Sequence, residues 1–174
     1  MSARWLIAAT YVSPTKANEM IHSNMENKSG PEIANRLYQV IQKNKASEEA
    51  YSKAANKVIS ANLKSHFQEI YTKRKRFDQT LTKEVSRIFP EPLPVAWKDN
   101  HIDLWIDIES IIRSSDDVTI LNACLQGDRL AVREYNELLE KYSLPFEVYH
   151  AIRKHKMFIE VDLQKMSNRK VYNS

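Results

Sequence analysis

The sequence predicts an all-α protein, folded as a bundle of four helices. Only two glycines and six prolines occur in 174 residues, far fewer than the turns of a β-rich fold would need. Long stretches place apolar residues three and four positions apart, which is the spacing of one helix face. The proline-rich segment FPEPLP at 89–94 then divides these stretches into two pairs.

The first helix is expected to begin at 29–32, where a capping-type serine, a glycine, a proline and an acidic residue follow one another. Its apolar stripe comprises Ile33, Leu37, Val40, Ile41, Tyr51, Ala55, Val58 and Ile59. A short turn at 60–62 leads to the second helix, which has the most regular spacing in the chain. Its seam comprises Leu63, Phe67, Ile70, Arg74, Phe77, Leu81, Val85 and Ile88.

A connector with Trp97 and Trp105 follows, and it contains a short helical stretch at 103–113. The segment SSDD at 114–117 caps the third helix, whose seam comprises Leu121, Cys124, Asp128, Ala131, Tyr135, Leu138 and Tyr142. The segment SLP at 143–145 makes the next turn. The fourth helix carries Val148, Ile152, His155, Ile159, Leu163 and Met166, and we expect it to fray after Ser167.

Two antiparallel helical hairpins joined by a long crossover with a short extra helix have the connectivity of ferritin-like folds. We therefore expect a flexible N-terminal extension at 1–30, the bundle at 31–170 and a short tail at 171–174. No apolar run approaches the roughly 20 residues of a membrane-spanning helix, and no secretory signal is evident at the start. The single cysteine, Cys124, fits a reducing compartment and is expected to be buried.

Bundles of this kind often hold two metal ions, bound by glutamates and by Glu-x-x-His pairs on facing helices. Two such pairs occur, at 19–22 and at 147–150, but the first lies in the aperiodic N-terminal segment and the second at one end of the bundle. At mid-height the second helix instead offers Arg74 and Phe77, which are not metal ligands. We therefore expect no di-metal centre and no cofactor.

A polar layer is predicted where the metals would lie. Counting from the two turns places Arg74 opposite the region of Glu48 and Asp128 opposite the region of Glu160. The candidate layer consists of Glu48 (or Asn44), Arg74, Asp128, His155 and Glu160, with the hydroxyls of Tyr51 and Tyr135 bonded to it. A buried arginine needs a carboxylate partner, and Asp128 is the best candidate. The alternative is that Arg74 extends to the rim and Asp128 is partly exposed.

Four consecutive basic residues, Lys73 to Arg76, do not form one patch on a helix. Successive residues turn by about 100°, so the four spread around most of the circumference, and the acidic residues Glu69, Asp78 and Glu84 dilute them. A solvated helix face is the favoured interpretation, and nucleic-acid binding is not expected at a net charge of only +4. A binder of anionic surfaces using Lys73, Lys75 and Arg76 is the weaker alternative.

Several segments together resemble a bacterial four-helix-bundle domain of unknown function in the ferritin-like superfamily, related to YciF-type stress-associated proteins. These segments are NRLYQVIQKNKASEEAYSKAANKV (35–58), LKSHFQEIYTKRKRFDQTLTKEV (63–85), IDLWIDIESII (102–112), DDVTILNACLQGDRLAVREYNELLEKY (116–142) and LPFEV (144–148). The resemblance covers about 32–166. It implies a cytoplasmic, dimeric or larger protein linked to stress physiology, with no assigned activity. It also implies that Asp128 is the remnant of a lost metal site, since metal-binding relatives carry a glutamate there.

These observations predict a non-enzymatic, stress-associated structural or interaction module that forms a homodimer and has no working di-metal centre. The partner protein is not identified by the sequence. The alternative is a metal-binding oxidative-stress protein with an atypical carboxylate site built on Asp128, Glu48 and Glu160.

Overall fold

The computed structural model describes residues 29–90 and 102–172, and the chain divides into two compact units, 1–32 and 33–174. The described residues are all-α, with no strand among them. Their helices are α2 (Ser29–Lys57), α3 (Ala61–Ile88), α4 (Ile108–Arg113), α5 (Asp117–Lys141) and α6 (Phe146–Tyr172). The N-terminal extension, the Glu-x-x-His pair at 19–22 and Trp97 lie outside the described residues, as do 173–174 of the expected tail.

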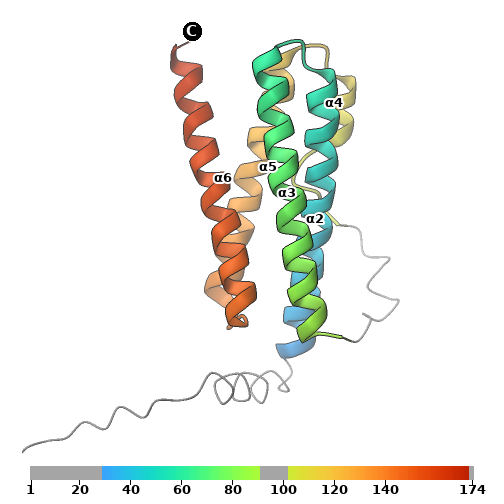
Figure 1. Cartoon of the computed structure of the whole chain (residues 1–174), viewed down its shortest axis with the longest axis vertical. Coiled ribbons are helices and arrows are strands. Elements are labelled where there is room, and N and C mark those ends of the chain that lie inside the picture. The colour runs from blue at the N-terminus through green and yellow to red at the C-terminus, as the bar shows by residue number, and fades with distance from the viewer. Residues whose placement is uncertain (1–28, 91–101, 173–174) are drawn as a thin grey trace, which may run out of the picture. The chain divides into compact units, whose positions relative to one another are not determined.

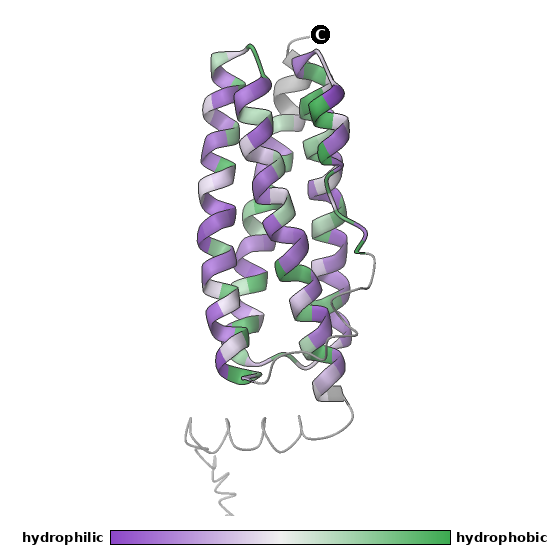
Figure 2. Cartoon of the chain, turned by 90° about the vertical axis from the view of Figure 1, so that its right-hand side faces the viewer, coloured by the Kyte–Doolittle hydropathy of each residue, from purple (hydrophilic) through white to green (hydrophobic). Residues whose placement is uncertain are grey.

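Within the second unit, the four long helices lie side by side, and short turns join α2 to α3 and α5 to α6 (Figure 1). Helices α3 and α5 run in the same direction, so α3 ends at the opposite end of the bundle from the start of α5 (Figure 1). Hydrophobic and hydrophilic residues alternate along each long helix (Figure 2). This pattern gives every helix one face for the shared core and one for water.

The core confirms the apolar stripe predicted for the second helix. All of its central members are buried, namely Phe67, Ile70, Arg74, Phe77, Leu81 and Val85. The other long helices contribute buried residues to the same core, among them Leu37, Tyr51, Tyr135 and Ile152. None of the helices in the described residues is long and apolar enough to cross a membrane.

The turn between α2 and α3 corrects one prediction. Ile59, expected in the apolar stripe of the first helix, is 88% exposed, because α2 ends at Lys57 and Ile59 lies in the turn. The backbone amides of Ile59 and Ser60 both donate to the carboxylate of Asp117, each at 2.8 Å. The first turn of α5 therefore holds the α2–α3 turn in place.

The expected helical stretch at 103–113 forms only from Ile108 onward, after Asp107 caps it by accepting from the amide of Ser110. The preceding residues Trp105 and Ile106 pack directly on α5 at Gly127. A Cβ atom at this position would lie 2.2 Å from Cγ1 of Ile106, so only glycine permits this approach. At the other end of the chain, α6 continues to Tyr172 instead of fraying after Ser167.

Candidate functional site

The centre of the bundle contains a buried ion pair between Arg74 of α3 and Asp128 of α5. Both residues are almost fully shielded from solvent. The second guanidinium nitrogen of Arg74 donates to Oδ1 of Asn44 at 3.1 Å, and Asn44 donates in return to the carbonyl of Arg74 at 3.2 Å. Tyr51 donates its hydroxyl to Oδ2 of Asp128 at 2.8 Å. We call these four residues, Asn44, Tyr51, Arg74 and Asp128, the mid-bundle cluster.

Within the mid-bundle cluster, the positive charge of Arg74 is balanced by the negative charge of Asp128. Burial raises the pKa of Asp128, and the charge of Arg74 and the hydrogen bond from Tyr51 oppose that rise. Burial by itself would lower the pKa of the Arg74 guanidinium, but the charge of Asp128, the hydroxyls of Tyr51 and Tyr135 and the hydrogen bond to Asp128 together raise that pKa. Burial also raises the pKa of Tyr51 well above its usual value. Each carboxylate oxygen of Asp128 already accepts a hydrogen bond, so the cluster offers no free carboxylate to a metal ion.

Beside the cluster, His155 of α6 pairs with Tyr135 of α5. The hydroxyl of Tyr135 lies 3.0 Å from Nδ1 of His155. The imidazole also stacks on Phe77, with ring centroids 3.8 Å apart and planes 15° apart. Burial, and secondarily the charge of Arg74, lowers the pKa of His155 well below its usual value, so the ring is neutral near pH 7.

The structure separates two predicted members from the candidate layer. Glu48 is only half-buried, and burial followed by the charge of Asp78 raises its pKa. The prediction named either Glu48 or Asn44 as the residue opposite Arg74, and the structure places Asn44 there. Glu160 lies on the surface, where it pairs with Lys156 at 3.2 Å. Of the five candidate residues, Arg74 and Asp128 therefore meet directly, and His155 lies in the adjoining layer.

Two polar groupings were missed by the sequence reasoning. His66 and Asp162 lie 3.2 Å apart and join α3 to α6. Asp162 is buried and follows His155 by seven residues. This spacing puts it on the same face of α6 as His155, so the sequence did contain a signal for it. On the other side, the indole of Trp105 donates to Glu134 at 2.7 Å, and Lys43 pairs with the same carboxylate oxygen at 2.8 Å.

The remaining candidate groups offer little chemistry. Cys124 is buried, and burial raises the pKa of its thiol, as for a small apolar side chain and not for a nucleophile. Glu147 and His150, the second Glu-x-x-His pair, are both exposed near the start of α6. Among the described residues, no group of three or more histidine, cysteine, aspartate or glutamate side chains could hold a metal ion.

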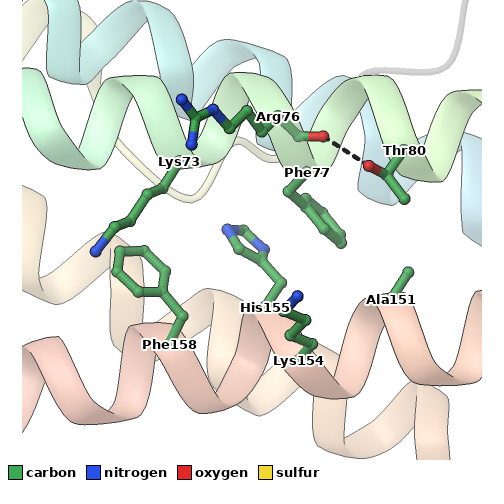
Figure 3. A pocket seen from close by; sticks show the side chains of 8 residues that line it. All are labelled: Lys73, Arg76, Phe77, Thr80, Ala151, Lys154, His155 and Phe158. Carbon is green, nitrogen blue, oxygen red and sulfur yellow. Dashed lines mark hydrogen bonds between the residues drawn. The ribbon is translucent and has the colours of Figure 1, made fainter.

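Of the four consecutive basic residues, Arg74 is buried and the other three are exposed, as the helical geometry predicts. Two of the exposed residues, Lys73 and Arg76, border a groove. Lys73 pairs with Glu69 at 2.6 Å and lies 4.5 Å from the ring centroid of Phe158 on α6. Together with Arg76 it flanks a cavity of about 370 Å³ between α3 and α6. Figure 3 shows His155 inside this groove, between Phe158 and Phe77. Linear sequence could not show that a second helix completes this surface.

Residues 32–141 match the family described as a domain of unknown function (DUF2383). Neither the curated proteins nor the solved structures contain a match to this chain. The match covers α3, α4 and α5 and most of α2, and hence every residue of the mid-bundle cluster.

Proposed function

Because the chain belongs to the DUF2383 family, a domain of unknown function, we propose its role from its own geometry. The protein is a non-enzymatic structural or interaction module of the cytoplasm, and its bundle has the ferritin-like connectivity without a working di-metal centre. The observation that carries this proposal is the Arg74–Asp128 pair at mid-bundle. The link to stress physiology rests on the resemblance of the sequence segments alone.

The mid-bundle cluster supports a structural role because its four residues make their ion pair and hydrogen bonds with one another. A metal centre at this height would need several free carboxylates or imidazoles. Arg74 instead brings a cation, which would repel a metal ion, and Asn44 and Tyr51 complete its surroundings. In some proteins a buried ion pair fixes how the elements pack, and here the hydrogen bonds of the mid-bundle cluster link α2, α3 and α5.

The outer face of α6 supports self-association as the mode of interaction. Phe146, Met157 and Val161 are exposed by 64%, 54% and 50%. Met157 follows Phe146 by eleven residues and Val161 follows Met157 by four, so the three share one side of the helix. We call these three residues the α6 outer face. Exposed apolar side chains collected on one side are typical of an interface between protein chains.

Metal analysis and solution mass test the proposal together. Protein purified without chelators should contain far less than one metal ion per chain, and light scattering should give the mass of a dimer. The Met157→Glu/Val161→Glu variant should be monomeric, and Ile112→Glu, at an exposed position on α4, should leave the mass unchanged. A monomeric native protein at tens of micromolar would refute self-association.

Stoichiometric iron, manganese or zinc would instead favour the metal-binding alternative. That alternative needs Asp128, Glu48 and Glu160 to meet at one site. The contacts of the described residues give it no support, because Asp128 is held by Arg74 and Tyr51, while Glu160 pairs with Lys156 on the surface.

A further inference from the structure

We propose that the groove between α3 and α6 binds a small organic carboxylate with a flat apolar body, received by the Nε2–H of His155 and by a cationic rim. The groove is lined by Lys73, Arg76, Phe77, Thr80, Ala151, Lys154, His155 and Phe158. Its volume of about 370 Å³ lies within the range of about 300–1,000 Å³ typical of small-molecule sites. This inference goes beyond the proposed function and does not depend on self-association.

The hydrogen-bond donor in the groove follows from the pairing of His155 with Tyr135. The buried hydroxyl of Tyr135 needs an acceptor, and Nδ1 of His155, at 3.0 Å, is the one it contacts. A neutral imidazole that accepts at Nδ1 carries its proton on Nε2. The Nε2 atom is buried and has no hydrogen-bond partner among the described residues. An unpaired buried N–H is unfavourable, and a ligand oxygen that accepts from it removes that cost.

The apolar walls of the groove favour a flat molecule. The ring of His155 lies nearly parallel to Phe77 on one side and to Phe158 on the other, with planes 15° and 19° apart. Its centroid lies 6.1 Å from that of Phe158, a wider separation than the 3.8 Å to Phe77. A separation of 6.1 Å is an ordinary contact distance between two rings and leaves no room for a third ring between them, so a flat apolar ligand would pack against the aromatic lining of the groove as a whole.

The charge of the rim favours an anion. Three of the eight lining residues are cationic and none is acidic. Lys73 is engaged by Glu69, whereas Arg76 and Lys154 make no ion pair within the described part of the chain. Arginine presents two parallel N–H donors that match the two oxygens of a carboxylate. Figure 3 shows the guanidinium of Arg76 directed away from His155, so this exposed side chain has to swing toward the groove to hold the charged end of the ligand.

Access to Nε2 requires a small movement of the groove's outer wall. The Nε2 atom is shielded from solvent, and Lys73 lies over the ring of Phe158 at the edge of the groove. Lys73 is exposed and Phe158 is half-buried, so their side chains can change rotamer without repacking the core. At about 100° per residue, His155 lies on the opposite side of α6 from Phe146, whereas Lys154 at the rim of the groove lies near Val161 of the α6 outer face.

A matched pair of probes tests the proposal. Naphthalene-2-carboxylate and its neutral amide have the same flat body and differ in charge. Calorimetry at low salt should show the carboxylate binding more tightly than the amide by about tenfold or more. Arg76→Ala should weaken carboxylate binding by about tenfold, while Arg129→Ala, at an exposed arginine on α5, should leave it unchanged. Equal affinity for the two probes, or no carboxylate binding at millimolar concentration, would overturn the proposal.

The role of the imidazole is tested separately. The Tyr135→Phe/His155→Phe variant removes the Nε2–H without leaving an unpaired hydroxyl, and circular dichroism checks that it folds. It should lose most of its carboxylate affinity, and the imidazole nitrogen resonance of His155 in the native protein should shift when the probe is added. Unchanged affinity in the double variant would refute the assignment of this donor. If that variant does not fold, the Arg76→Ala comparison and the resonance shift still decide the matter.

Discussion

Replacing Arg74 with methionine should destabilise the bundle strongly, because Asp128 would keep only one of its two buried hydrogen-bond partners. The substitution removes the ion pair, the 3.1 Å hydrogen bond to Asn44 and the contact of the guanidinium with the ring of Tyr51. Removing one partner of a buried pair typically costs about 3–5 kcal/mol. The reciprocal change, Asp128→Leu, leaves a buried guanidinium and an unpaired Tyr51 hydroxyl, so we expect a similar loss of about 3–5 kcal/mol.

The double variant Arg74→Met/Asp128→Leu should lose much less than the sum of the two. It contains no buried charge at this site, and well-packed apolar replacements of ion pairs are neutral or stabilising by about 1–4 kcal/mol. Against this, Tyr51 and Asn44 each lose a partner, at about 1–3 kcal/mol apiece. Taken at the middle of these ranges, the net cost is about 2 kcal/mol, against about 6–10 kcal/mol for the sum of the two single changes, so the two residues should be coupled by several kcal/mol.

Urea unfolding of the four proteins in this cycle measures the coupling directly. The exposed pair between Lys53 and Glu49, at 2.6 Å, is the matched control, and its coupling should be only about 0.2–1 kcal/mol. If the two core substitutions add within about 0.5 kcal/mol, Arg74 and Asp128 do not stabilise each other, and the account of the mid-bundle cluster is wrong.

Three further predictions concern the packing around the cluster. Gly127→Ala should lower the free energy of unfolding in urea by about 1–3 kcal/mol despite the better helix propensity of alanine, because its Cβ would lie 2.2 Å from Ile106; a more stable variant would contradict this. Because burial lowers the pKa of His155, the unfolded chain binds a proton below about pH 6.5 that the folded chain excludes. The free energy of unfolding should therefore fall below that pH by up to about 1.4 kcal/mol per unit, and the Tyr135→Phe/His155→Phe variant should show a flatter curve. Trp105→Phe should cost about 1–2 kcal/mol, measured by thermal or urea unfolding, through loss of the indole hydrogen bond and of buried area, and no change would contradict the 2.7 Å contact.

The central part of each long helix could be predicted from the sequence because its causes are local, whereas some ends could not: α2 stops at Lys57 and α6 continues to Tyr172. The spacing of Phe67, Ile70, Arg74, Phe77 and Leu81 marks one face of α3 whatever the rest of the chain does. The side-chain oxygens of Ser60 and Asp116, which accept hydrogen bonds from amides three residues later, begin α3 and α5 near the expected positions. These effects act within a few residues, so they can be recognised from the sequence without knowledge of the tertiary structure.

The candidate site could be predicted only to within about one helical turn. Counting from the turns placed Arg74 and Asp128 at the same height, the need of a buried arginine for a carboxylate paired them, and the two do meet. The same counting could not choose between Asn44 and Glu48, which lie four residues apart on one face of α2. The choice depends on the rotation and axial shift of α2 against α3, and neither quantity has a local signal in the sequence.

The sequence by itself therefore determined the all-α class, the helices and the buried stripe, because backbone hydrogen bonding and apolar periodicity are properties of short segments. Only the tertiary structure decided that His155 pairs with Tyr135, that Gly127 admits Ile106, and that Arg76 borders a groove with α6. Each of these depends on how closely two helices or segments approach and at what angle. That approach is set by the fit of many side chains at once, and so no single stretch of sequence contains it.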